Sequence, residues 1–238
     1  MDEAQLHIVL VGNPNTGKST LFNALTGQNQ KVSNLPGTTI EKKQGFFIYD
    51  NVRVNITDLP GTYSLYPNGE DEQIATQFIL NHQQNKIDAI VFVADAGNLE
   101  RNLLLYTQIA DLGIPTLIAL NMLDMLEKKK IGINIETLSL SLQTIVVPIN
   151  ARSGNGIRQL KTNILKTSQA VQRSFFNPTP EQQQLITLSQ TEGTAYAKWQ
   201  NIFLQYKKAD LSPELTTLFE TALPFSDKII AEETTQRF

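Results

Sequence analysis

A glycine-rich octapeptide near the N-terminus has the residue types and spacing to bind phosphate. Residues 12–19 read Gly-Asn-Pro-Asn-Thr-Gly-Lys-Ser and match the pattern G-x-x-x-x-G-K-[ST] in full. The glycines let backbone N–H groups converge on phosphate oxygens, Lys18 is expected to reach the β- and γ-phosphates, and Ser19 is expected to bind Mg²⁺. The pattern predicts nucleotide binding without specifying the base, by Asn13, Asn15, Thr16, Gly17, Lys18, Ser19 and Thr20.

A second candidate motif is Asp58-Leu59-Pro60-Gly61. Here Asp58 is expected in the Mg²⁺ shell, and the Gly61 amide is expected to sense a γ-phosphate. An Asp before a Pro-Gly turn is on its own most often a turn former. The position of this motif after the phosphate loop favours the functional interpretation.

The third candidate motif, Asn121-Met122-Leu123-Asp124, is expected to read the base. The Asp124 carboxylate can accept hydrogen bonds from guanine N1–H and N2–H₂, whereas adenine presents an acceptor at N1. Asn121 belongs to the same element, and Met122 stands where a lysine is usual, with a thioether that can cover the face of the base. The motif therefore favours GTP over ATP.

Two further segments are expected to complete the site. The backbone of Asn150-Ala151-Arg152 is expected to close the guanine pocket, with Asn150 in place of the usual serine; a simple strand-to-helix loop is the alternative. Residues 31–40 read as a mobile switch loop in which Thr38 or Thr39 caps Mg²⁺, and an ordinary surface loop is the alternative there.

Alternating short apolar runs and helical patterns must position these motifs. Apolar runs at 6–11, 89–94, 116–120 and 144–149 are typical of buried parallel strands, and 46–49 and 52–56 flank a two-residue turn typical of a hairpin. A helix is expected at 19–26, closed by Gly27. The pattern predicts an α/β fold of the P-loop (Ras-like) GTPase type: a mixed, mostly parallel sheet of about six strands flanked by helices.

The composition changes after about residue 168, where Gln, Thr and Pro become frequent and strand-like runs end. Apolar residues at helical spacing, Trp199 to Tyr206 and Leu215 to Ala222, are interpreted as the core of a small all-α bundle. We therefore expect a GTPase (G) domain at 1–168, a linker at 169–177 and a helical domain at 178–238.

Composition narrows the function further. The net charge of −3 and the absence of a basic run count against nucleic-acid binding. With no cysteine and only His7 and His82, the chain offers no ligand set selective for Fe²⁺. No signal peptide and no apolar run of about 20 residues is visible, so we expect a cytoplasmic segment, which could be a fragment.

The motifs and the residues around them resemble the N-terminal cytoplasmic domain of the FeoB ferrous iron transporters. The resemblance covers about residues 6–165 and rests most narrowly on the Tyr63-Ser64-Leu65 extension and on the string Asn-Leu-Glu-Arg-Asn-Leu at 98–103. It implies slow, Mg²⁺-dependent and K⁺-stimulated GTP hydrolysis at the cytoplasmic face of the bacterial inner membrane. It further implies a nucleotide-dissociation-inhibitor-like helical domain that leads into a membrane domain of the same protein, with accessory iron-transport proteins and a homo-oligomer as further partners.

The resemblance also assigns roles within the site. It makes Thr39 the switch threonine that binds Mg²⁺ with Ser19 and Asp58, and Asn15 a ligand of K⁺ beside the phosphates. Carbonyls of Ser33 and Leu35 complete that K⁺ shell, where family members often have Gly and Trp. Lys18, Thr39, Gly61 and Asn15 are thereby the expected catalytic residues.

Two other functions remain open from the sequence. A soluble potassium-dependent GTPase of ribosome or tRNA assembly would share Asn15 and the phosphate loop, although such proteins usually carry a basic appendage. A pure interaction module would bind GTP without useful hydrolysis, which Thr62 permits because it stands where many GTPases have a water-orienting Gln.

Overall fold

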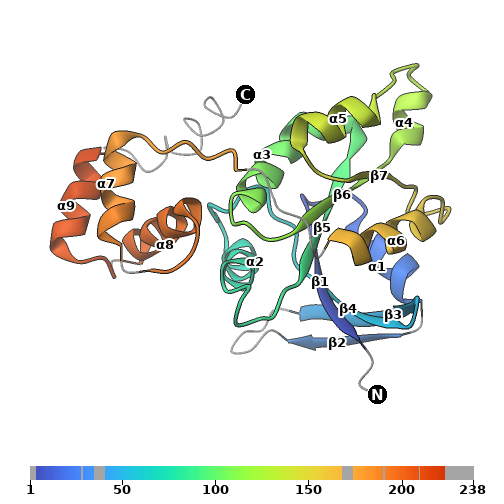
Figure 1. Ribbon diagram of the computed structural model, residues 1–238, viewed down its shortest axis with the longest axis horizontal. Helices are drawn as coiled ribbons and strands as arrows, with labels where there is room; N and C mark the ends of the chain where they lie inside the picture. The colour runs from blue at the N-terminus through green and yellow to red at the C-terminus, as the bar shows by residue number, and fades with distance from the viewer. Residues whose placement is uncertain are drawn as a thin grey trace.

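A seven-stranded sheet, on the right in Figure 1, lies between layers of helices. The computed structural model describes residues 4–27, 29–34, 41–167, 174–189, 191–208 and 210–222. The strand order is β2-β3-β4-β1-β5-β6-β7. The strands are β1 (Gln5–Val11), β2 (Gln30–Asn34), β3 (Glu41–Tyr49), β4 (Val52–Asp58), β5 (Ala89–Asp95), β6 (Thr116–Asn121) and β7 (Val146–Pro148).

The sheet is mixed, as the sequence predicts. Strands β4, β1, β5, β6 and β7 are parallel, whereas β3 pairs antiparallel with both β2 and β4. Asp50 and Asn51 make the β3–β4 turn with φ of 49° and 60°. Two successive positive φ values are typical of a type I′ hairpin turn, whose twist matches that of the strands.

The prediction of about six strands, with a loop at 31–40, was wrong at β2. Residues 30–34 form an edge strand whose register runs from Gln30 opposite Gly45 to Asn34 opposite Glu41. The segment Gln-Lys-Val-Ser-Asn has a single apolar residue, so no alternation marked it. Backbone hydrogen bonds to β3 define this strand, and sequence periodicity does not reveal such bonds. Residues 35–40 lie outside the described part of the chain.

Helices cover both faces of the sheet. One buried cluster joins helices α1 (Lys18–Thr26) and α6 (Ile157–Thr167) to alternate residues of the strands. The other face packs against α2 (Glu70–Leu80), η1 (Ala96–Asn98), α3 (Leu99–Ala110), α4 (Leu123–Glu127) and α5 (Ile135–Leu142). The expected layered α/β architecture is confirmed.

Three more helices follow: α7 (Pro180–Leu188), α8 (Ala195–Lys207) and α9 (Pro213–Ala222). Thr179 begins α7 with a capping box, and the Thr194 side chain caps α8. Trp199, Ile202 and Phe203 are buried, which confirms their interpretation as core residues. Their cluster is continuous with that of the sheet, so these helices pack against the rest of the chain. None of the described helices is long and apolar enough to cross a bilayer.

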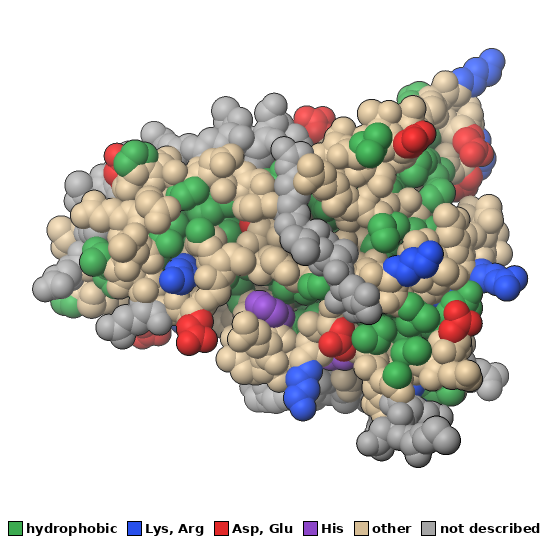
Figure 2. Space-filling view, in the orientation of Figure 1, with side chains coloured by type: hydrophobic (Ala, Val, Ile, Leu, Met, Phe, Trp, Pro, Cys, Tyr) green, Lys and Arg blue, Asp and Glu red, His purple; other side chains and the backbone are tan. Residues whose placement is uncertain are grey.

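One buried carboxylate fastens the segment before α7 to the sheet region. Asp111 Oδ1 accepts hydrogen bonds from Ser174 Oγ (3.1 Å), from Phe176 N (2.9 Å) and from Phe175 N. The Asp111 carbonyl accepts a fourth from Thr194 Oγ1 (2.7 Å). The connection into the C-terminal helices is therefore anchored at residues 174–176. On the face drawn in Figure 2, acidic and basic side chains are scattered rather than gathered by sign.

Candidate nucleotide-binding site

The phosphate loop lies between the end of β1 and the start of α1, the position its motif requires. Gly17 has φ of 87°, and a Cβ there would lie 2.3 Å from Asn121 Nδ2. Only glycine fits this backbone conformation beside the neighbouring side chain. Asn15 also has a positive φ, 66°, and its side chain is exposed at the rim. The loop therefore leaves α1 with open N–H groups, an arrangement suited to phosphate.

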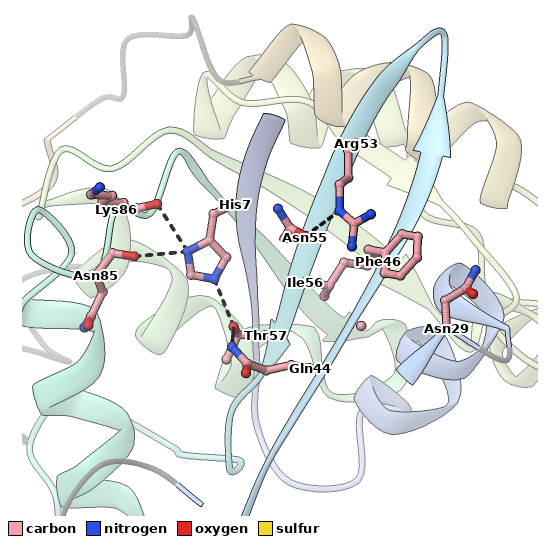
Figure 3. A pocket seen from close by; sticks show the side chains of 11 residues that line it. His7, Asn29, Gln44, Phe46, Arg53, Asn55, Ile56, Thr57, Asn85 and Lys86 are labelled. Atoms are coloured by element: carbon pink, nitrogen blue, oxygen red, sulfur yellow. Dashed lines mark hydrogen bonds between the residues drawn. The ribbon is translucent and has the colours of Figure 1, made fainter. Parts of the chain in front are cut away.

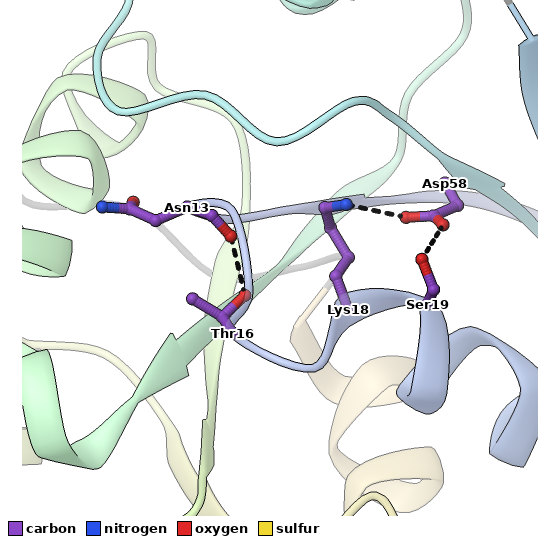
Figure 4. Close-up of polar contacts among 5 residues, drawn as sticks. All are labelled: Asn13, Thr16, Lys18, Ser19 and Asp58. Atoms are coloured by element: carbon purple, nitrogen blue, oxygen red, sulfur yellow. Dashed lines mark hydrogen bonds and ion pairs between the residues drawn. The ribbon is translucent and has the colours of Figure 1, made fainter.

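Two residues of the loop meet Asp58 at the end of β4 (Figure 4). Lys18 Nζ lies 3.3 Å from Asp58 Oδ1, and Ser19 Oγ lies 3.4 Å from Asp58 Oδ2. Burial raises the pKa of the Asp58 carboxyl above its ordinary value, and the Lys18 charge acts in the opposite direction. A buried carboxylate with a hydroxyl beside it is a pair of hard oxygen ligands.

The Gly61 segment, residues 59–66, lies against the phosphate loop. A Cβ on Gly61 would come within 2.9 Å of Pro14 N, and Thr62 N donates to the Gly12 carbonyl at 3.3 Å. Thr62 is fully buried, and its hydroxyl donates to the Ser64 carbonyl at 2.7 Å. The Thr62 hydroxyl is therefore engaged within its own turn.

The predicted base-reading residues surround a cavity of about 300 Å³ beside the phosphate loop. The lining combines the loop with the ends of β6 and β7, which are neighbours in the sheet. The structure thus brings together three motifs that are far apart in sequence. The lining residues are Gly17, Thr20, Asn121, Met122, Asp124, Met125, Asn150, Ala151 and Arg152.

The buried Asn121 side chain joins two of these segments. Its Nδ2 donates to the Thr16 carbonyl at 3.0 Å, and its Oδ1 accepts from Ala151 N at 3.1 Å. This role in assembling the pocket was not predicted, because it depends on contacts across 105 and 30 residues. The Ala151 amide was expected to contact guanine, but here it donates to Asn121 Oδ1. Its contact with guanine therefore stays a prediction.

Asn150, the departure from the usual serine, contacts the predicted base-selecting carboxylate. Its Nδ2 lies 3.4 Å from Asp124 Oδ1, and its Oδ1 accepts from Arg152 N and Ser153 N at 3.1 and 3.0 Å. Asn150 therefore fixes its own loop and also lies beside Asp124. The substitution is visible in the sequence, whereas this contact depends on the fold.

The remaining predicted site residues are Asn13 and those of the switch segment. Thr39 and Leu35 lie outside the described residues, as does Thr38, and Ser33 is part of β2. The Asn13 side chain is buried, and in Figure 4 its amide points away from Lys18 and Asp58. Any contact of Asn13 with nucleotide is therefore expected from its backbone, whose carbonyl accepts from Thr16 Oγ1 at 3.0 Å.

A hydrogen bond between distant aromatic residues links the Gly61 segment to the C-terminal helices. Trp199 Nε1 in α8 donates to the Tyr66 hydroxyl at 2.9 Å, and both side chains are buried. The Phe203 ring meets the Tyr66 ring edge-on, with centroids 4.7 Å apart. No sequence signal pairs Tyr66 with Trp199, which lie 133 positions apart.

Comparison with known proteins gives the family. A family model described as ferrous iron transport protein B matches residues 6–164. The Fe(2+) transporter FeoB of Legionella pneumophila (strain Paris) is 41% identical over 235 residues, which cover 97% of this chain and 31% of that protein. The Fe(2+) transporter FeoB of Leptospira biflexa is 49% identical over 160 residues, which cover 67% of this chain and 23% of that protein. The chain thus spans less than a third of the length of these two relatives.

Solved structures agree with this result. The cytosolic domain of L. pneumophila FeoB is 38% identical, with coverage of 97% of this chain and 95% of its own, and superposes with a TM-score of 0.83. A mutant of S. thermophilus NFeoB bound to GDP is 33% identical, with coverage of 97% and 93% and a TM-score of 0.78. The chain therefore belongs to the ferrous iron transport protein B family and has the fold of that family's cytosolic G domain.

Proposed function

We propose that this chain binds GTP with Mg²⁺, hydrolyses it slowly, and uses the nucleotide state to control ferrous iron transport by a longer protein. The observation that carries the proposal is the convergence of Lys18, Ser19 and Asp58 beside the pocket that contains Asp124. The residues proposed to bind phosphate, Mg²⁺ and the base thus lie next to one another, as the parts of a single bound nucleotide require. The GDP bound to the related S. thermophilus domain supports the same ligand class here.

Asp124 is the proposed selector of guanine. Its carboxylate is exposed to the pocket and can accept from N1–H and N2–H₂ of guanine together. Asn150 lies within 3.4 Å of that carboxylate and limits the positions it can adopt. The flexible Met122 side chain, also in the lining, can cover a face of the base.

The chemistry of the donor set fits Mg²⁺. Asp58 and Ser19 present a carboxylate and a hydroxyl, oxygen ligands of the kind that Mg²⁺ takes together with water and phosphate oxygens. When bound, Mg²⁺ would neutralise charge on the β- and γ-phosphates. Lys18 pairs with Asp58 here, and we infer that it turns to the phosphates when nucleotide enters. Thr39 is the proposed third protein ligand.

The arrangement around Thr62 favours slow hydrolysis that uses an additional charge. The buried Thr62 hydroxyl is bonded to Ser64, so Thr62 is a poor candidate for orienting the attacking water. The exposed Asn15 carboxamide, at the rim of the phosphate loop, could hold a K⁺ ion with carbonyls of Ser33 and Leu35. Such an ion would supply positive charge beside the phosphates, as an arginine finger does elsewhere.

The remainder of the function belongs to the longer protein. We assign residues 1–168 to the G domain, 169–177 to a linker and 178–238 to a helical domain that leads into a membrane domain at the bacterial inner membrane. Accessory iron-transport proteins and a second copy of the chain are the further partners proposed. Two relatives that are longer than this chain are named Fe(2+) transporter FeoB, which supports a role of the longer protein in ferrous iron transport.

The bond between Tyr66 and Trp199 supports a mechanical link from nucleotide to helices. Tyr66 lies five positions after Gly61, and its turn is fixed by Gln108 Oε1, which accepts from Leu65 N at 2.8 Å. A γ-phosphate that draws in the Gly61 amide would pull on this turn and, through Tyr66, on the contact with α8. We infer that this contact passes the switch state to the helical domain.

The test is Lys18→Ala in this chain, compared with Lys129→Ala, which removes an exposed charge away from the pocket. We expect Lys18→Ala to lose GTP binding or hydrolysis, and Lys129→Ala to behave as wild type, in calorimetric titrations and phosphate-release assays. Full activity of Lys18→Ala would refute the site. In the full-length transporter reconstituted in vesicles, wild-type ferrous uptake by Lys18→Ala would refute the control of transport.

A further inference from the structure

A second cavity among the described residues lies away from the nucleotide pocket, on the face of β1, β3 and β4 opposite to α1. It has a volume of about 640 Å³, against about 300 Å³ for the pocket beside the phosphate loop, and falls within the range of small-molecule sites. Phe47, Val54 and Ile56 of the hairpin pack towards α1. The alternate residues of the hairpin therefore face the cavity, where Figure 3 shows their side chains: Gln44, Phe46, Arg53, Asn55 and Thr57.

Arg53 is held in a fixed position within this cavity. Its guanidinium carbon lies 3.6 Å from the centroid of the Phe46 ring, and its Nε donates to Asn55 Oδ1 at 3.2 Å. These two contacts fix the plane of the guanidinium. Phe46 contacts its flat face and Asn55 contacts its Nε, so neither contact uses the two terminal nitrogens. A planar fork held in this way is suited to two parallel hydrogen bonds to one oxyanion.

The opposite wall of the cavity is also rigid. His7 Nδ1 lies 3.0 Å from the Asn85 carbonyl and 3.2 Å from the Lys86 carbonyl, two acceptors to which it can donate. His7 Nε2 is hydrogen-bonded to Thr57 Oγ1 at 2.9 Å. Both ring nitrogens are thereby used inside the protein, and His7 serves as a fixed wall of the site.

The charge of the lining selects the ligand. Arg53 and Lys86 line the cavity, and among the described residues no Asp or Glu does. The ion pair found in the described part of the chain joins Lys18 to Asp58, so neither cation of the cavity is neutralised by a carboxylate there. The remainder of the lining includes the side-chain amides of Asn29, Gln44 and Asn55, whereas Asn85 donates its side-chain amide to the Phe78 carbonyl at 2.8 Å. Such a lining complements an anion carried on a polar body and does not suit an apolar ligand or a cation.

We propose that this cavity binds a small polar molecule that bears a carboxylate or a phosphate group, with Arg53 as its anchor. The oxyanion accepts from the terminal nitrogens of Arg53, and side-chain amides of the lining bind the polar body. This site is separate from the nucleotide pocket, and its existence does not depend on GTP binding.

The experiment titrates inorganic phosphate and, separately, succinate into the ¹⁵N-labelled chain at constant ionic strength set with chloride. The readout is the Arg53 Nε–H and Asn55 side-chain amide signals, because phosphate also reaches the Lys18 loop and would move signals there. We expect at least one anion to give a saturable shift at Arg53 by roughly 20 mM, a dissociation constant in the millimolar range. The anion that saturates identifies the chemistry.

Three variants test the assignment. Arg53→Ala is expected to weaken binding roughly tenfold or more, because it removes a charge-assisted fork, and Arg53→Lys should weaken it less. Arg158→Ala removes an exposed charge from α6 on the other face and should bind as wild type. Signals of Phe46 and Thr57 show whether each variant is folded. Linear shifts with both anions, or equal binding by wild type and Arg53→Ala, would overturn the proposal.

Discussion

Changing Tyr66 to Phe tests the contact between the Gly61 segment and α8. The change deletes the hydroxyl that accepts from Trp199 Nε1 at 2.9 Å and keeps the ring that meets Phe203. Tyr66 and Trp199 are 1% and 0% exposed, so water cannot replace the lost acceptor without rearrangement. The expected cost is that of an unsatisfied buried donor, about 1–3 kcal/mol.

The cost converts into a measurable shift of the thermal midpoint. For a chain of this length, a loss of about 2 kcal/mol lowers the midpoint by about 4–8 °C. Circular dichroism follows the whole chain, and the emission of Trp199, the single tryptophan, follows the contact itself. Tyr63→Phe is the matched control, because the Tyr63 side chain is 39% exposed and its hydroxyl can keep water; we expect a change within about 0.5 kcal/mol.

A double-mutant cycle separates the hydrogen bond from general packing. In a Trp199→Phe background the donor is already absent, so Tyr66→Phe should cost about 1 kcal/mol less than in wild type. If the two changes add to within about 0.3 kcal/mol, or if Tyr66→Phe leaves the midpoint unchanged, the bond does not fasten α8 to this segment. The proposed link from nucleotide to helices would then lose its support.

Three further predictions concern the site and the pH response. Hydrolysis should be faster in KCl than in NaCl at equal ionic strength, and Asn15→Ala should remove that difference while GDP still binds; equal wild-type rates in both salts would contradict a potassium role. Asp124→Asn should weaken GTP binding roughly tenfold or more and improve xanthosine triphosphate binding, and an unchanged preference in titrations would refute the base site. Burial lowers the pKa of His82 below its ordinary 6.5, so the unfolded chain takes up this proton first, and stability should fall as pH drops below 6.5. In urea titrations at several pH values His82→Gln should flatten that dependence, and an identical pH profile for variant and wild type would exclude His82 as the cause.

The nucleotide motifs could be read from the sequence because each is local. Gly12 to Ser19 lies on one strand-to-helix turn, and its glycines are required by the backbone that any such loop adopts. The apolar runs of β1, β5 and β6 were equally plain, since strands buried on both faces have few polar residues. The order of the motifs along the chain was plain as well, whereas the meeting of their strand ends depends on the order of the strands in the sheet.

Tertiary structure decided the features that depend on partners distant in sequence. Strand β2 exists because β3 offers it a hydrogen-bonding edge, and its own residues carry no alternation. The Asn121 side-chain amide binds the backbone of Thr16 and Ala151. Asn121 was expected to help read the base, and in the structure it holds the walls of the base pocket together.

The pairing of Tyr66 with Trp199 and the cavity around Arg53 belong to the same class of feature. An aromatic residue at helical spacing predicts burial, but its hydrogen-bond partner is fixed only when α8 packs on the Gly61 segment. Alternation in the hairpin predicts which side chains share a face of the sheet. Whether a cavity forms on that face depends on which helices cover it, and the sequence of the hairpin does not contain that information. The conformation of a turn such as the phosphate loop is determined by a short stretch of sequence. Contacts between distant elements are determined only when the whole chain has packed.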